Sequence, residues 1–355
     1  MKKMSRILCM MLALTMILAI FSSCSSNGSG SGQTSTEPPT SNTTQTEGTV
    51  DRSHWPEFIK IGSASPGGYW FMVAAALSEV INNEFSNVNA TPTSGGQVSN
   101  LTNCDSGEFL IALGCNYTET DAMNGVAPFE QPLTNVRSMG NLYPSQWHII
   151  TLEEANINSI PDLKGHDFSA GTKGMGGEVM AERILGDYGM TYDDLGKMNL
   201  TGYDDAGLLM KDKHIDAMFI QIMAPAAAFV DVGTFLPLKI ISVDEDRMEE
   251  ICKKYNMFPG EIPANTYPGQ TEAVMCPCAT NEFIVNKELP EDMVYEITKA
   301  LWENIDQIKA VSTGLASYCN IEDAVEGLGL PLHKGAYKYY VEMGLDIPEA
   351  AMPID

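Results

Sequence analysis

Basic residues are scarce in this sequence. The 355 residues contain 21 Lys and Arg against 46 Asp and Glu, which gives a net charge of −25. Residues 1–23 hold Lys2, Lys3 and Arg6 and no acidic residue, so the rest of the chain is more acidic still. Nucleic-acid binders need clustered Lys and Arg to contact phosphates. The composition therefore excludes a nucleic-acid partner.

Catalytic motifs are absent as well. The sequence contains no H-E-x-x-H metal motif, no G-x-S-x-G serine elbow and no Walker phosphate loop. Acidic pairs such as Asp193 with Asp194 are more typical of solvated helix starts than of acid–base catalysis. The His residues lack the spacing of metal ligands and stand at positions 54, 148, 166, 214 and 333. We therefore expect no enzyme, no metal site and no cofactor.

The N-terminal residues have the pattern of an export signal. A basic cluster at residues 2–6 precedes an apolar run, residues 7–21, that is too short for a comfortable membrane span. Small residues and Cys24 follow, so residues 1–23 resemble a bacterial lipoprotein signal peptide, after which Cys24 is acylated. Phe21 stands where such signals usually have Leu. An ordinary signal peptide and an uncleaved membrane anchor are the alternatives.

Residues 24–50 lack the apolar side chains that a folded segment needs. Ser, Thr and Gly dominate, and Val50 is the first aliphatic residue after Cys24. Such a segment cannot bury enough apolar surface to offset its ordering entropy. We predict a lipidated flexible linker over 24–50 that tethers a folded part, 51–355, to the outer face of the cytoplasmic membrane. No later run is apolar enough to span a bilayer.

Cysteine is present in an even number outside the signal and the anchor. An exported chain of this kind could form disulfides, and their connectivity stays open. Cys276 and Cys278 are the only close pair, and C-x-C alone is weak evidence for metal or redox chemistry. Buried free thiols in a strand are the expected state of this pair. The residues concerned are Cys104, Cys115, Cys252, Cys276, Cys278 and Cys319.

The folded part alternates strand-like and helix-like segments. This alternation predicts an α/β fold of two lobes, with ligands bound at the carboxyl ends of the strands. The predicted strands are 58–61, 88–93, 109–113, 136–140, 147–151, 167–170 and 214–220, with a further apolar segment at 273–285. The predicted helices are 69–81, 98–106, 178–188 and 292–311, with a short helical turn at 160–165.

Loops of small residues follow three of the predicted strands. They span residues 62–68, 94–97 and 171–177, and each leads into a predicted helix. Helix N-termini carry unpaired N–H groups and a partial positive charge, and glycine allows close approach, so such loops bind carboxylate or phosphate oxygens. Each loop alone can be a simple tight turn. Three of them in one chain favour a cleft that holds a small anion.

The same loops resemble those of a known family. Residues 61–69 (IGSASPGGY), 93–101 (TSGGQVSNL) and 174–178 (GMGGE) look like three of its characteristic stretches. Three later segments are similar to its IPAGTYPG, LPEDVVY and PLHPGAxRYY stretches: residues 262–270 (IPANTYPGQ), 289–295 (LPEDMVY) and 331–340 (PLHKGAYKYY). On this basis residues 57–345 resemble the TAXI subfamily of solute-binding proteins, which serve tripartite ATP-independent periplasmic (TRAP) transporters.

The resemblance implies a type II periplasmic-binding-protein-like fold whose ligand cleft lies between two lobes joined by crossing segments. Lobe 1 would comprise about 57–145 plus 275–355, and lobe 2 about 146–274. The protein would be a monomer that closes on its ligand by hinge motion and delivers it to a TRAP permease. The ligand would be a small carboxylate or amino acid similar to glutamate, glutamine or 2-oxoglutarate. A ligand-sensing lipoprotein for a signalling partner and a lipid-anchored hydrolase are the alternatives.

The loops and the resemblance together define candidate ligand-binding residues. Tyr69 would cover the ligand or pack in the core, and Lys173 would pair with a carboxylate or stay exposed. Backbone N–H groups would come from Gly67, Gly68, Gly95, Gly96, Gly174, Gly176 and Gly177. Side-chain donors would be Gln97, Asn100, Asn116 and Thr172, and the set is completed by Ser65, Met175, Gln221 and Pro225.

Some of these positions depart from the family pattern. Gln97 stands where many members have Ser, Met175 where Ser is usual, and Gly177 where Thr is usual. Residues 115–117 read Cys-Asn-Tyr where the family often has Gln-Ser-Asp. Because two hydroxyl donors of the third loop are missing, we assign no particular ligand.

Overall fold

The computed structural model describes residues 51–66, 68–312 and 314–354, which belong to one compact unit. The predicted signal peptide, the linker, Cys24 and Gly67 lie outside the described residues, so the predictions about them stay predictions. No helix in the described part is long and apolar enough to cross a membrane.

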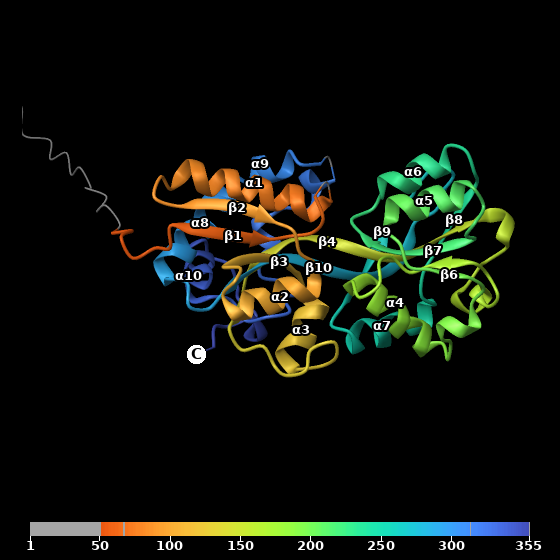
Figure 1. The fold of residues 1–355 in the computed structure, drawn as a ribbon, viewed down its shortest axis with the longest axis horizontal. Coiled ribbons are helices and arrows are strands. Elements are labelled where there is room, and N and C mark those ends of the chain that lie inside the picture. Colours follow the sequence, from red (N-terminus) through yellow and green to blue (C-terminus); the bar gives the residue numbers. More distant parts are fainter. Residues whose placement is uncertain (1–50, 67, 313, 355) are drawn as a thin grey trace, which may run out of the picture. The chain divides into compact units, whose positions relative to one another are not determined.

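Within these residues ten strands form one sheet, and helices lie on both sides of it (Figure 1). The strands are β1 (Phe58–Gly62), β2 (Asn89–Thr93), β3 (Ile111–Cys115), β4 (Val136–Leu152), β5 (Phe168–Ser169), β6 (Met198–Asn199), β7 (Ala217–Ile222), β8 (Leu238–Ile241), β9 (Phe258–Ile262) and β10 (Val274–Asn286). The helices are α1 (Tyr69–Glu84), α2 (Gln97–Ser106), α3 (Asn116–Asn124), α4 (Gly176–Asp187), α5 (Tyr203–Lys211), α6 (Ala227–Gly233), α7 (Glu245–Lys254), α8 (Glu291–Glu303), α9 (Ile305–Lys309) and α10 (Lys334–Glu342).

The sheet consists of two halves that repeat one strand order. In the first lobe the order is β2-β1-β3-β10-β4, where β1, β2 and β3 are parallel and β10 is antiparallel to β3. In the second lobe the order is β6-β5-β7-β4-β8, where β5, β6 and β7 are parallel and β4 is antiparallel to β7. Strands β4 and β10 run across between the halves (Figure 1). The predicted two-lobed α/β fold of type II with crossing segments is confirmed.

Strand β4 corrects one prediction. The sequence suggests two strands, 136–140 and 147–151, whereas the chain forms a single strand of 17 residues, Val136–Leu152. The intervening residues change partners without ending the strand: residues 136–146 pair with β10, and residues 146–152 pair with β7 and β8. Pro144 lies opposite Thr280 close to this change of partner. A proline there looks like a strand break in the sequence.

Strand β7 shows why the second lobe needs helices on both faces. Ala217 and Phe219 point into one apolar cluster, whereas Met218 and Ile220 point into another. Successive side chains of a strand face opposite sides of the sheet, and here both sides are buried. A strand that is covered on both faces therefore has a continuous run of apolar residues, without alternating polar ones.

Most of the other predicted elements lie within a few residues of their positions. The predicted helix 292–311 is the exception, because the chain forms α8 and α9 with a break at Asn304. The Asn304 side chain donates to the carbonyl of Ala300 (3.0 Å) and so closes the end of α8. Helix α3 was not predicted, because its buried residues are mostly polar and include Asn116 and Glu119.

The six Cys residues of the described part are free and buried. Cys276 and Cys278 both lie in β10, which confirms the expectation of buried thiols in a strand. Burial raises the pKa of the Cys252 thiol to about 12, so this thiol is uncharged and unreactive at neutral pH.

A buried His–Tyr pair connects β4 to the segment before α6. Tyr267 donates its hydroxyl proton to His148 Nε2 (3.0 Å) and accepts from the backbone N–H of Ala226 (3.0 Å). The other ring nitrogen, His148 Nδ1, donates to the carbonyl of Gln146 (3.1 Å). Burial lowers the pKa of His148 to about 3, so the ring is neutral and one nitrogen can accept. This network explains why a Tyr stands within the 262–270 segment.

Replacing Tyr267 by Phe should lower the free energy of unfolding by about 1–3 kcal/mol, because it leaves a buried acceptor on His148 and a buried donor on Ala226 without a partner. Urea denaturation would measure the change. The control is Tyr318→Phe, since Tyr318 is only half-buried and burial is what makes a lost partner costly. Equal stabilities of the two variants would contradict this account.

Candidate functional site

The three predicted loops begin helices α1, α2 and α4. The residues before these helices are Gly68, Gly96 and Met175, and none of them places a side-chain hydrogen bond on the helix end. The first N–H groups of each helix consequently have no partner from the capping residue. A ligand oxygen is one of the groups that can satisfy them.

The second and third loops meet across the two lobes. A Cβ added at Gly96 would lie 3.1 Å from Met175 Sδ, and one added at Gly176 would lie 1.2 Å from Gln97 Oε1. Gln97 of the first lobe therefore fills the space directly beside the start of α4 in the second. Any side chain at position 176 would have to displace it.

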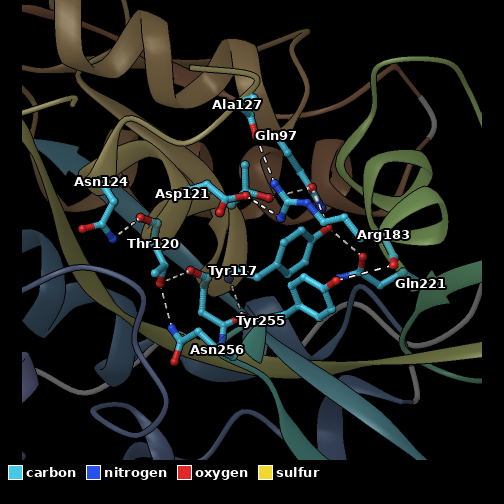
Figure 2. Close-up of polar contacts among 12 residues, drawn as sticks. Gln97, Tyr117, Thr120, Asp121, Asn124, Ala127, Arg183, Gln221, Tyr255 and Asn256 are labelled. Carbon is cyan, nitrogen blue, oxygen red and sulfur yellow. Dashed lines mark hydrogen bonds and ion pairs between the residues drawn. The ribbon is translucent and has the colours of Figure 1, made fainter. Parts of the chain in front are cut away.

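Tyr117 connects Gln97 to the second lobe (Figure 2). Its hydroxyl lies 2.7 Å from Gln221 Oε1 and 2.8 Å from Gln97 Oε1, and Thr118 also donates to Gln97 Oε1 (3.1 Å). The single Tyr117 proton can serve Gln221 while Thr118 serves Gln97. Burial raises the pKa of Tyr117 well above its ordinary value, so the hydroxyl keeps that proton.

Gln221 is in turn fixed by residues of β4, β3 and α5. Its Nε2 group donates to Ser145 Oγ (3.3 Å) and to Cys115 Sγ (3.4 Å). The backbone N–H of Gln221 donates to Tyr203 Oη (3.1 Å). These bonds use both ends of the Gln221 amide. By contrast, the Nε2 group of Gln97 makes no hydrogen bond within the described residues.

Two residues of β4 that the sequence analysis missed flank this cluster. Tyr143 and Trp147 are each 2% exposed, and Tyr143 Oη and Trp147 Nε1 have no hydrogen-bond partner within the part of the chain that the structure describes. Tyr143 packs against Tyr69 with ring centroids 5.7 Å apart, and Trp147 is the cross-strand neighbour of Gln221. Unpaired buried donors are costly and often mark a ligand or water position. No motif in the sequence marks them.

Other predicted residues make their hydrogen bonds inside the protein. Asn100 donates to the carbonyls of Ser63 (2.9 Å) and Leu113 (2.8 Å), which fixes the second loop to β1 and β3. Asn116 donates to the carbonyls of Asn256 (2.8 Å) and Gly327 (3.0 Å). Both side chains therefore position the site rather than offer free donors to it.

The remaining predicted residues contact other neighbours or lie at the surface. The hydroxyl of Tyr69 is hydrogen-bonded to the hydroxyl of Ser312. Gly177 lies near Tyr203, because a Cβ added at Gly177 would be 3.3 Å from Tyr203 Oη. Gly95 lies against Asn100. The exposed positions are Ser65, Thr172, Lys173, Gly174 and Pro225.

A second set of contacts between the lobes involves α3 (Figure 2). Arg183 of α4 pairs with Asp121 (2.7 Å) and donates to the carbonyl of Ala127 (3.0 Å). Asn256 donates to Thr120 Oγ1 (2.8 Å). Burial raises the pKa of Asp121, although the Arg183 guanidinium acts to lower it. The ion pair is thus partly desolvated, with side chains 20% and 17% exposed.

The cluster is made of polar, uncharged and aromatic groups. Its converging side chains are amides, hydroxyls and aromatic rings, and no group of His, Cys, Asp or Glu in the described residues is arranged to hold a metal ion. Two surface cavities of about 720 and 530 Å³ lie elsewhere, beside Trp55 and beside Trp302, and contain none of the predicted loop residues.

Residues 61–344 match the model of the NMT1-like family. The chain belongs to the NMT1-like family. The match contains all three loops and both crossing strands, so the site described above lies entirely within the family's part of the sequence.

Several solved structures are similar to this NMT1-like chain. PhnD1 from Prochlorococcus marinus in complex with methylphosphonate is 13% identical, covering 81% of this chain and 97% of that one, with a TM-score of 0.47. The aliphatic sulphonate binding protein SsuA of Escherichia coli is 15% identical, covering 81% and 83%, with a TM-score of 0.43. A structure from work on glutathione import in Streptococcus mutans is 13% identical, covering 74% and 97%, with a TM-score of 0.45.

In this NMT1-like chain, Gly176→Ala should destabilise the fold by about 1–3 kcal/mol, because the new methyl group overlaps Gln97 Oε1 and must force that side chain out of its contact with Tyr117. Urea denaturation of Gly176→Ala in the wild-type and Gln97→Ala backgrounds measures the coupling, and the cost should shrink in the second background.

The matched control for this experiment lies in the same helix. Gly186 of α4 has no atom within 4 Å of an added Cβ, so Gly186→Ala should be neutral or stabilise by about 0.5–1 kcal/mol. A Gly176→Ala protein as stable as the Gly186→Ala protein would show that the two loops are not in contact.

Proposed function

We propose that residues 51–355 form an extracytoplasmic solute-binding protein that captures a small carboxylate or amino acid between its two lobes and passes it to a TRAP permease. The observation that supports the proposal is that Gln97, Tyr117 and Gln221 come from both lobes and are hydrogen-bonded to one another. They lie beside the N-termini of α2 and α4, whose capping residues make no side-chain hydrogen bond to the helix. The same set supports solute binding rather than catalysis, since it offers donors and no nucleophile with a base.

The donors available at the site suit carboxylate oxygens. They comprise the first N–H groups of α2 and α4, the free Nε2 group of Gln97, and the buried Tyr143 hydroxyl and Trp147 indole. Neutral donors fixed in position can hold an anion without a basic side chain, because they need no reorganisation when it binds. The ligand could be similar to glutamate, glutamine or 2-oxoglutarate.

The contacts of α3 suit a protein that closes on its ligand. Asp121–Arg183 and Thr120–Asn256 join the lobes through exposed or half-buried side chains. Such contacts can separate at small cost when the lobes move apart, because water replaces the lost partners. The crossing strands β4 and β10 would serve as the hinge.

The location and partners of the protein are part of the proposal. Residues 1–23 would be removed, Cys24 would carry lipid, and 24–50 would tether a monomeric binding unit with lobe limits near residues 145 and 275. A sensor that presents the same bound state to a signalling partner is the second candidate, since the same lobes would serve it. An adjacent TRAP permease gene would favour transport, and an adjacent sensor kinase gene would favour signalling.

Small carboxylates and amino acids should raise the melting temperature of the protein. At a hundred times Kd, a ligand adds about 2.7 kcal/mol to the free energy of unfolding. The measurement is a thermal-shift panel of amino acids, 2-oxo acids and dicarboxylates, on protein refolded to remove any ligand carried through purification.

A pair of variants ties that shift to the site. Gln97→Ala should reduce the shift caused by the best compound, whereas Gln131→Ala should leave it unchanged because Gln131 is exposed and takes no part in the hydrogen bonds of the cluster. Absence of a shift across the whole panel would refute the ligand class. A shift that survives Gln97→Ala in full would place binding elsewhere.

Cys24→Ala should move the full chain from the membrane fraction to the soluble fraction, because the acylated side chain is lost. Fractionation of cells that express the protein, with incorporation of labelled fatty acid, provides the measurement. Cys9→Ala is the control and should change neither readout. Retention of the Cys24→Ala protein in membranes would favour the uncleaved anchor instead.

A further inference from the structure

Two carboxyl groups meet in the interior of the first lobe. Glu119 of α3 and Glu282 of β10 are both fully buried. Carboxylates at such positions are expensive unless they are neutralised or bonded to donors. The pair takes no part in the hydrogen bonds of the ligand-binding cluster, but α3 contributes to both.

The hydrogen bonds divide unequally between the two groups. Glu282 accepts from the hydroxyl of Ser138, from Thr280 Oγ1 (3.3 Å) and from the backbone N–H of Gly329 (3.3 Å). Neither oxygen of Glu119 accepts from any donor within the described residues. A carboxyl group that receives no hydrogen bond but touches a carboxylate can only be satisfied as a donor.

Burial and the neighbouring Glu282 carboxyl raise the pKa of Glu119 well above its ordinary value. Burial also raises the pKa of Glu282, against the effect of its hydrogen bonds from Glu119 and Ser138. Two adjacent carboxyl groups in a medium of low dielectric cannot both ionise, and one proton between them relieves the repulsion.

Two glycines lie close to the Glu119 side chain. A Cβ at Gly114 would lie 2.1 Å from Glu119 Oε1, and one at Gly329 would lie 2.7 Å from Glu119 Cβ. Gly114 therefore leaves the space that the Glu119 carboxyl group fills, whereas Gly329 lies even closer to the backbone of Asn116, with an added Cβ 2.2 Å from its carbonyl oxygen. The close packing of Gly114 and Gly329 against α3 holds the Glu119 side chain in the interior of this lobe.

The other titratable groups that face the pair do not supply a positive charge. They are Cys104 of α2, Cys115 at the end of β3 and Tyr340 of α10. Burial raises the pKa of each of them, so all three are neutral at pH 7. The charge balance of the pair thus depends on its own proton.

Helix α3 links the pair to the proposed ligand site. Tyr117 contacts Gln97 and Gln221 two residues before Glu119, and Asp121 contacts Arg183 two residues after it. We propose that Glu119 carries a proton that it donates to Glu282, and that this bond fixes α3 so that Tyr117 and Asp121 reach the second lobe. Glu119 is then a positioning residue, and only the role of Tyr117 in ligand binding rests on the proposed function.

Glu119→Gln is the decisive variant, because its amide keeps the shape and the donor of a protonated carboxyl group but has no proton to lose. In infrared spectra near pH 7, the wild type should show the C=O band of a protonated carboxylic acid, and Glu119→Gln should lack it. A band that survives in Glu119→Gln but disappears in Glu282→Gln would put the proton on the wrong residue for the proposal. Absence of this C=O band from the wild-type spectrum would also overturn the proposal.

The dependence of stability on pH gives an independent readout. Above the ordinary Glu pKa of about 4.3, the unfolded chain releases the proton while the folded chain keeps it. The unfolding equilibrium constant of the wild type should therefore rise about tenfold per pH unit relative to Glu119→Gln, from about pH 5 until the folded pair ionises. Glu326→Gln changes an exposed Glu of the same lobe and should follow the wild type. Parallel curves for Glu119→Gln and the wild type would refute the proposal.

Hydrogen exchange tests the positioning role. At alkaline pH the amides of α3 should lose protection in the wild type and keep it in Glu119→Gln at the same pH. Equal protection in the two proteins would show that the proton is unrelated to the position of α3. None of these measurements needs a ligand, so a negative ligand panel would refute the proposed function and leave this inference intact.

Discussion

Neither lobe can complete its sheet without a strand that continues into the other. Strand β4 is the outer strand of the first lobe over residues 136–146 and the antiparallel strand of the second over 146–152. Strand β10 is the antiparallel strand of the first lobe and also pairs with β9 beyond it. Both lobes are therefore joined through the backbone hydrogen bonds of the same two strands, and Ser145 of β4 contacts the cluster around Tyr117 through Gln221.

The cluster works within a protein of net charge −25. Such a surface repels an anionic solute, but at physiological salt this field fades within about 8 Å. In the proposed function, selection of the ligand is then left to the uncharged donors of Gln97, Tyr143 and Trp147. The acidity of the outer surface and the proposed binding of a carboxylate are compatible because they act over different distances.

The sequence predicted those parts whose signal is local. Strand–loop–helix units such as β1 with α1 follow from apolar periodicity and glycine placement, and Gln97 was found because it follows such a loop. Tyr143, Trp147 and Glu119 were not found, because their importance depends on partners far away in the chain. Helix α3 was missed because its buried face is polar, and periodicity detects only apolar faces. The sequence pattern does not tell which residues far apart in the chain contact each other.

The six thiols have a practical consequence. Since none of the described Cys residues is in a disulfide, the fold does not depend on the redox state of its surroundings. Each thiol is protected from thiol reagents while it stays buried, so its reaction would report that it has become exposed. Cys115 accepts a hydrogen bond from Gln221 across the lobes, whereas Cys104 lies within the core of the first lobe alone. A thiol reagent would therefore report the proposed separation of the lobes at Cys115 and the unfolding of the first core at Cys104.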